Sequence, residues 1–164
     1  KRQSTEAEPQ EVNASAEETP VEETAAEPTY TVSETLTRPV PGEVMTEFSD
    51  TPVYSETMRD YRVHAGTDYT AAHGETVHAC ANGIVKETHT DMLRGNMIVI
   101  EHGDYEVRYC GLGETFLVHE GDVVTAGQDI GSVTAAPFES ALDSHLHIEV
   151  TRNGEPVDPE SVFG

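Results

Sequence analysis

Short runs of β-branched and aromatic residues recur along the chain from Tyr30 onward, and turn-forming residues separate them. Residues of these types favour strands, because their side chains pack well on a pleated, half-buried surface. Glycine, aspartate and asparagine mark turns between the runs at residues 82–83, 102–104 and 121–122. Six segments are therefore predicted to be strands, namely residues 76–79, 83–86, 97–100, 106–109, 130–133 and 145–150.

No long segment has the periodicity of an amphipathic helix, and no internal repeat is visible. Residues 30–164 therefore suit one all-β domain, either a barrel or a sandwich. Residues 1–29 differ, since they contain eight Glu, no aromatic residue and only two Val as larger aliphatic residues. Such a segment cannot bury enough apolar surface to offset the entropy lost on ordering, so it is predicted to be a disordered acidic Glu/Ala/Thr/Pro linker.

The chain has a formal net charge of -22, from 31 acidic and 9 basic residues. This balance disfavours nucleic acid and anionic membrane surfaces as partners, because binding to both depends on Lys and Arg. No apolar stretch approaches the roughly 18 residues of a membrane span. Because the chain begins at Lys1 rather than Met, we expect a fragment or processed form from which an upstream targeting segment has been removed.

Two histidines and a glutamate alternate with apolar residues between His145 and Val150. On a strand, His145, His147 and Glu149 share one face, and the intervening residues face the core. The two imidazoles then stand about 7 Å apart along the strand, so one can bind a metal while the other reaches a reacting water. The same pattern also fits two polar residues that merely face solvent.

A second candidate element is His64-Ala65-Gly66-Thr67-Asp68. In an extended chain His64 and Asp68 would lie about 13 Å apart, which is too far for both to bind one ion. A bend is therefore expected at Gly66, because glycine permits it, and a strand is expected to resume at Thr67. Two imidazoles and one carboxylate make an ordinary zinc ligand set.

These two elements resemble the two signature motifs of the LytM/lysostaphin-type zinc endopeptidases. Residues 74–85, 95–103, 120–131 and 153–159 are similar to further segments of that family, in the same order and at similar spacing. The resemblance implies a small antiparallel LytM-like β-sandwich or half-barrel with a groove over a Zn2+ site. It also implies cleavage of peptide cross-links in bacterial peptidoglycan, with His64, Asp68 and His147 as zinc ligands and His145 as a catalytic residue.

One position departs from the family pattern. The family's second catalytic histidine lies in a Y-x-H-L strand, whereas this chain has Tyr109-Cys110-Gly111-Leu112, with Gly111 in place of the histidine. The loss of one group that stabilises developing charge commonly costs about 10²- to 10³-fold in rate. Cys110 is expected to face the opposite side of the strand, and no neighbouring base is evident that would make it a nucleophile. Cys80 and Cys110 allow either one disulfide or two free thiols.

Residues 54–58 and 61–64 resemble the corresponding segments of stage II sporulation protein Q and its clostridial relatives. That resemblance implies an extracytoplasmic domain at the cell envelope, on the outer surface of the forespore, attached through an N-terminal membrane anchor. It implies a partner ectodomain similar to stage III sporulation protein AH in the intermembrane space. The acidic linker suits this layout.

Three functions follow as hypotheses. The first is a degenerate, zinc-retaining scaffold that binds a sporulation partner and hydrolyses little. The second is an active zinc-dependent peptidoglycan endopeptidase in which another group replaces the missing imidazole. The third is an acidic binding module that holds no metal.

Overall fold

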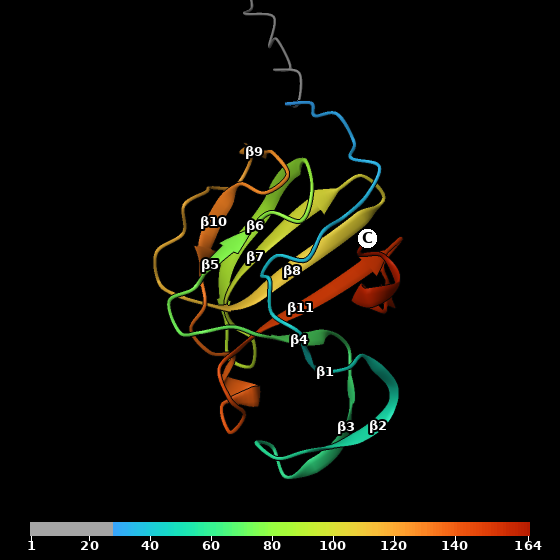
Figure 1. The fold of residues 1–164 in the computed structure, drawn as a ribbon, viewed down its shortest axis with the longest axis vertical. Coiled ribbons are helices and arrows are strands. Elements are labelled where there is room, and N and C mark those ends of the chain that lie inside the picture. Colours follow the sequence, from blue (N-terminus) through green and yellow to red (C-terminus); the bar gives the residue numbers. More distant parts are fainter. Residues whose placement is uncertain (1–27) are drawn as a thin grey trace, which may run out of the picture.

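The computed structural model describes residues 28–164 of the chain, and Figure 1 shows their arrangement. Of the predicted linker, only residues 28 and 29 lie within this range, so its structure stays a prediction. The described part of the chain contains strands and two short 3-10 helices, and all the paired strands are antiparallel. The expected all-β fold class is confirmed.

The largest element is an eight-stranded sheet. Its strands follow the order β1 (Val44–Thr46), β4 (Thr67–Thr70), β11 (His145–Arg152), β8 (Tyr105–Leu112), β7 (Gly95–His102), β6 (Gly83–Asp91) and β9 (Val123–Val124), and β12 (Glu155–Val157) pairs with β11.

Two smaller sheets accompany it: β10 (Asp129–Ser132) with β5 (Thr76–His78), and β2 (Ser49–Ser55) with β3 (Asp60–His64). The 3-10 helices are η1 (Pro137–Glu139) and η2 (Pro159–Ser161). Each of the six predicted strands overlaps an observed one.

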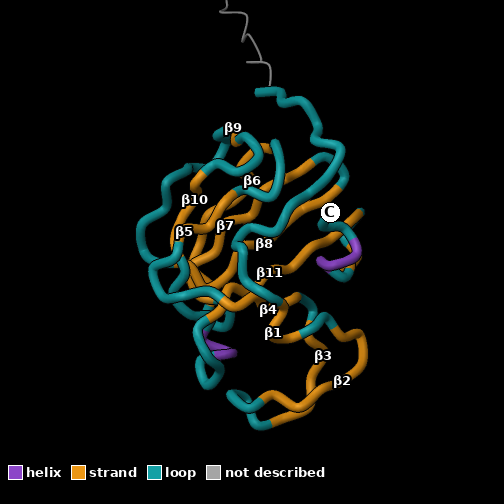
Figure 2. The backbone as a smooth tube through the Cα atoms, viewed as in Figure 1, coloured by secondary structure: helices purple, strands orange, loops and turns teal. Residues whose placement is uncertain are grey.

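One face of the large sheet packs into a single buried cluster with β5, β10 and the segment around residues 36–40. Leu146, Ile148 and Val150 of β11 are fully buried in it, as the alternation predicted. Figure 2 shows these strands curving around the core, while the β2–β3 hairpin projects away from it. The opposite face of β11 is therefore left to carry the polar residues.

His102 is a buried structural residue that precedes a turn. Its ring is 2% exposed. Nδ1 donates to the carbonyl oxygen of Asn82 at 3.0 Å, and Nε2 lies 2.8 Å from the hydroxyl of Tyr109. Burial lowers the pKa of His102 to about 4, so the ring is neutral near pH 7, and with its proton on Nδ1 the Nε2 atom accepts from the Tyr109 hydroxyl. The same hydroxyl accepts from the backbone N–H of Cys80.

The stability of the fold is expected to fall between pH 6.5 and pH 4 through His102. Burial lowers the pKa of His102 to about 4, against the effect of its hydrogen bond to Asn82. The unfolded chain takes up a proton near pH 6.5 and the folded chain only near pH 4, so this contribution is complete above pH 6.5 and lost below it. The loss amounts to ~3 kcal/mol. Urea unfolding of the unaltered protein and of His102→Gln across this range measures it, and equal pH slopes in the two proteins would contradict it.

Candidate metal centre

Two segments that are distant in sequence, residues 64–68 and 145–147, bring the candidate residues together. His64 ends β3, and Asp68 lies on β4 directly opposite His147 of β11 in the strand register. His145 and His147 are on the same face of β11, as predicted. A second acidic residue, Glu139 of η1, joins them, and no sequence motif predicts it.

The bend expected between His64 and Asp68 is present, because β3 ends at His64 and β4 starts at Thr67. Close packing is what requires a glycine there. A Cβ on Gly66 would lie 2.3 Å from the carbonyl oxygen of Ile148 and 2.9 Å from the ring of His147. The glycine thus lets the chain approach β11 closely just before β4 pairs with it.

We call His64, Asp68, Glu139 and His147 the ligand cluster. One nitrogen or oxygen atom from each residue lies within 4.8 Å of the others. His147 Nδ1 is 2.7 Å from Asp68 Oδ1 and 2.6 Å from Glu139 Oε1. His64 Nε2 is 3.3 Å from Asp68 Oδ2 and 3.4 Å from Glu139 Oε2. His145 Nε2 lies just beyond, 3.5 Å from Glu139 Oε2.

The cluster fits a cation better than it fits a network of hydrogen bonds. All four residues are buried, with exposures from 0% for Asp68 to 8% for His64. Yet His64 Nε2, Asp68 Oδ2 and both carboxylate oxygens of Glu139 have no hydrogen-bond partner. Buried polar atoms normally have a hydrogen-bond partner, so these unpaired atoms indicate that they share a ligand such as a cation. Two histidines with carboxylates are suitable zinc ligands.

In His64 and His145, a hydrogen bond from the ring nitrogen that points away from the ligand cluster fixes the orientation of the ring. His64 Nδ1 lies 2.9 Å from the carbonyl oxygen of Glu47, and His145 Nδ1 lies 2.7 Å from that of Asp143. A carbonyl oxygen can only accept, so Nδ1 carries the proton in each ring. The Nε2 lone pairs are therefore directed at the centre, as metal-binding histidines require.

His147 is oriented in the opposite sense, by a charged group on its own strand. Its Nε2 donates to Glu149 Oε1 at 3.1 Å, which turns Nδ1 towards the ligand cluster. Arg94 Nε holds the same oxygen at 3.0 Å, and Arg108 approaches the other oxygen at 3.6 Å. Burial would raise the pKa of Glu149, but His147 and Arg94 outweigh it and lower that pKa to about 2. Glu149 is thus a fixed anion that orients the ring of His147.

The carboxylates of the cluster draw protons onto its histidines. Burial alone would lower the pKa of His64, but Asp68 and Glu139 raise it to about 9. The pKa of His147 is likewise raised well above its usual value, by Asp68, Glu139 and Glu149 against the effect of burial. A bound cation would take the place of these protons, so we expect metal binding to release protons.

The backbone conformation and the packing around position 111 both require a glycine there. Cys110 and Gly111 together lie opposite Met97 in a β-bulge of β8, and Gly111 has a φ of +73°. A Cβ at this position would be 2.6 Å from the backbone nitrogen of Ala136. The segment that leads into η1 therefore occupies the space beside position 111.

Cys110 does not face away from the histidines, contrary to expectation. It pairs with His147 across β8 and β11, and directly paired residues lie on the same face of a sheet. The bulge at Gly111 breaks the alternation on which the expectation rested. Burial raises the pKa of the Cys110 thiol to about 12, so it is not a nucleophile. Cys80 and Cys110 are both free thiols, and both are buried.

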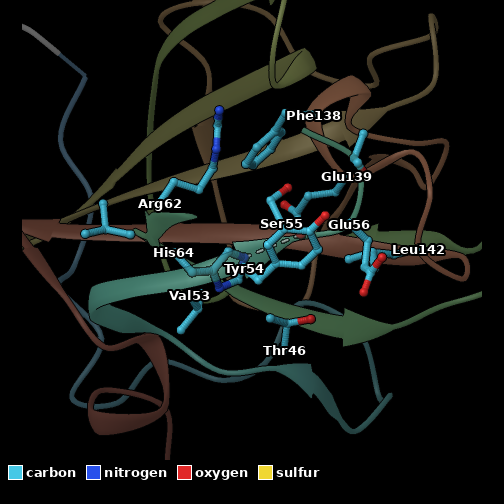
Figure 3. Close-up of a pocket in the computed structure, with 12 residues that line it drawn as sticks. Thr46, Val53, Tyr54, Ser55, Glu56, Arg62, His64, Phe138, Glu139 and Leu142 are labelled. Atoms are coloured by element: carbon cyan, nitrogen blue, oxygen red, sulfur yellow. Dashed lines mark ion pairs between the residues drawn. The ribbon is translucent and has the colours of Figure 1, made fainter. Parts of the chain in front are cut away.

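A pocket of about 170 Å³ opens beside the cluster, between the β2–β3 hairpin and η1 (Figure 3). His64 and Glu139 form its inner end, and Tyr54, Phe138 and Leu142 are among its apolar walls. The pocket therefore reaches two members of the ligand cluster from the hairpin side.

Comparison with known proteins identifies the class of protein to which this site belongs. The family model described as peptidase family M23 matches residues 62–159. The chain belongs to this family, which confirms the expected LytM/lysostaphin-type relationship. Peptidoglycan DD-endopeptidase ShyA of Vibrio cholerae serotype O1 is 35% identical over 96 residues, which are 58% of this chain and 22% of that protein. The chain thus spans about a fifth of this relative.

Solved structures share the fold. A zinc-containing peptidase from Vibrio cholerae superposes with a TM-score of 0.64 at 27% identity, covering 79% of this chain and 39% of that one. The SpoIIQ–SpoIIIAH pore-forming complex contains a chain that superposes with a TM-score of 0.68 at 21% identity. The match covers 79% of this chain and 90% of that one. At that identity the second similarity concerns the fold alone.

Proposed function

We propose that the chain is a zinc-holding M23 domain of the cell envelope that hydrolyses peptidoglycan weakly or not at all and serves to bind a protein partner. His64, Asp68 and His147 are the proposed zinc ligands, and His145 is the proposed remaining catalytic histidine. The buried, unpaired atoms of the ligand cluster support the metal. When bound, zinc would polarise a peptide carbonyl and favour attack by water.

The observation that supports weak hydrolysis is the close packing of the backbone around Gly111, which leaves no room for a side chain. An imidazole at this position would have to start from a Cβ that overlaps the backbone of Ala136. The proposed site therefore keeps one histidine outside the zinc ligands, His145, where the family pattern has two. Loss of a group that stabilises charge in the transition state commonly lowers the rate by about 10²- to 10³-fold.

Partner binding is supported by the β2–β3 hairpin. Residues 54–58 and 61–64, which resemble stage II sporulation protein Q, lie at the end of β2, in the turn and in β3 of this projecting element (Figure 1). Tyr61 is 74% exposed, Val63 52% and Tyr54 49%. Exposed aromatic and aliphatic side chains in one patch are typical of a protein interface. The partner we propose is an ectodomain similar to stage III sporulation protein AH.

The proposed location is outside the cytoplasm, at the cell envelope. A relative named for action on peptidoglycan supports this place. The finer location, the outer surface of the forespore with an upstream membrane anchor, rests on the resemblance of residues 54–64. No helix among residues 28–164 is long and apolar enough to cross a membrane.

A second candidate function is active peptidoglycan endopeptidase, and one geometric observation favours it. His145 Nε2 lies 3.5 Å from Glu139 and 3.8 Å from Asp68, so one catalytic histidine is in place beside the centre. The sequence similarity to a DD-endopeptidase also supports the endopeptidase function.

Zinc content and peptidoglycan hydrolysis, measured on one preparation, separate these functions. We expect about one zinc per chain after dialysis, and no release of peptides from purified peptidoglycan between pH 6 and pH 9, a window that spans histidine titration. A partner ectodomain should bind, and Tyr61→Ala should weaken that binding. Strong hydrolysis that disappears in His64→Ala would establish the endopeptidase instead, and loss of all zinc on dialysis would leave a metal-free binding module.

A further inference from the structure

Resting on the proposed zinc site, we infer that Glu139 is a fourth protein ligand, which closes the centre and excludes an external ligand from the metal. The resemblance supplied only three ligands, and Glu139 belongs to none of the motifs that carried it. The inference follows from where the Glu139 carboxylate lies, from how its segment is anchored and from what surrounds it.

The distances place Glu139 among the ligands rather than behind them. Its oxygens lie 2.6 Å from His147 Nδ1 and 3.4 Å from His64 Nε2. With bonds of about 2.1 Å, neighbouring donors of a tetrahedral zinc are about 3.4 Å apart, which matches the separation from His64 Nε2, whereas the separation from His147 Nδ1 is shorter. A carboxylate that acted only through an intervening water would stand farther from the ligand nitrogens than either distance.

Hydrogen bonding alone does not account for this carboxylate. Glu139 is 6% exposed, and neither of its oxygens has a hydrogen-bond partner of acceptable geometry. His147 Nδ1 faces both Glu139 and Asp68, but one ring nitrogen carries at most one proton. A single cation between the carboxylates and the imidazole would satisfy all of them.

The backbone holds Glu139 in this position from three directions. Phe138 N–H donates to the carbonyl oxygen of Leu93 at 2.9 Å, and Thr134 N–H donates to that of Gly111 at 2.8 Å. Ala141 N–H donates to Thr57 Oγ1 of the β2–β3 turn at 3.0 Å. The ring of Phe138 also packs edge-on against His147, with centroids 5.0 Å apart. Glu139 is therefore presented by an anchored segment.

A fourth protein ligand changes what the site can do. Catalytic zinc sites use three protein ligands and keep one position open, whereas structural sites use four. With Glu139 bound, that open position is filled from within the chain. The same segment blocks position 111, so one stretch of chain, residues 134–141, accounts for both departures from an active site.

The test uses cobalt in place of zinc, because the visible spectrum of Co²⁺ responds to its ligands. Azide added to the cobalt-loaded unaltered protein should leave the spectrum unchanged, whereas azide should change the spectrum of Glu139→Ala. Zinc affinity, measured by competition with a chelator, should fall at least about tenfold in Glu139→Ala. Glu139→Gln, which keeps the size of the side chain, should show the same loss if the smaller variant does not fold.

Glu56→Ala is the matched control, because Glu56 lines the same pocket, is exposed and forms no hydrogen bond or ion pair with the ligand cluster. It should bind zinc as the unaltered protein does. An azide-dependent spectrum in the unaltered protein, or zinc affinities for Glu139→Ala and Glu139→Gln within twofold of it, would overturn the role of Glu139 and leave the zinc site standing. Absence of metal binding by the unaltered protein would overturn both proposals.

Discussion

Replacing Gly111 with histidine is expected to destabilise the protein by ~3 kcal/mol and not to create hydrolytic activity. A left-handed backbone costs a residue with a Cβ about 1–2 kcal/mol, and overlap in a packed region costs about 1–3 kcal/mol more. Both apply here, since Gly111 has a φ of +73° and its Cβ would be 2.6 Å from the backbone of Ala136. Urea unfolding and peptidoglycan hydrolysis of the variant test the two parts.

Two alanine variants separate the cost of the left-handed backbone conformation from the cost of steric overlap with Ala136. Gly111→Ala should lose nearly as much stability as the histidine variant, because its Cβ meets the same backbone. Gly127 has a φ of +83° with nothing within 4 Å of its Cβ position, so Gly127→Ala should lose only the conformational part, about 1–2 kcal/mol. A Gly111→His protein of normal stability that releases peptides would show that the segment before η1 yields easily and that the missing imidazole was the only defect.

Replacing Asp68 with asparagine is expected to lower zinc affinity by at least about 100-fold. Loss of a partner outside the ligand set costs 10- to 100-fold in metal affinity, and Asp68 is a proposed ligand within it. Zinc at 1,000 times its dissociation constant stabilises a protein by about 4 kcal/mol. At the same zinc concentration, a 100-fold weaker affinity leaves zinc at only about 10 times the dissociation constant of Asp68→Asn, which stabilises the variant by about 1.4 kcal/mol. We therefore expect zinc to raise the melting temperature of the unaltered protein and to raise that of Asp68→Asn by at most about a third as much.

Asp104→Asn is the control for the removal of a negative charge. Its side chain is 78% exposed and lies outside the ligand cluster, so its zinc-dependent stabilisation should equal that of the unaltered protein. If Asp68→Asn binds zinc as tightly as Asp104→Asn does, Asp68 is not a ligand.

The sequence predicted the strands that have a buried face. Alternation along β11 and the apolar run in β7 identify these strands because their side chains enter one core. The β2–β3 hairpin was missed for the same physical reason. Most residues of β2 are exposed on both faces, and Pro52 lies within the strand, so the pattern that marks a strand is absent.

The candidate site was predictable only where ligands belong to a local pattern. His145 and His147 share a face through strand geometry, and His64 and Asp68 are joined by a tight bend. Glu139 has no such signal, because the loop between β10 and β11 is positioned by long-range backbone contacts. The sequence pattern indicates only that Gly111 replaces a histidine, whereas the position of the β10–β11 loop also requires a glycine there. Both misses thus arise from one loop whose path the local sequence does not encode.

His64 is the last residue of β3, so the projecting hairpin and the ligand cluster share one strand. A ligand that favours one position of the hairpin also favours one position of the imidazole. The two binding equilibria are then coupled, and the coupling free energy is the same in both directions. Whatever factor a partner on the hairpin contributes to the affinity for the ion, the ion must contribute to the affinity for the partner. Metal availability would thereby regulate assembly without any peptide bond being cut.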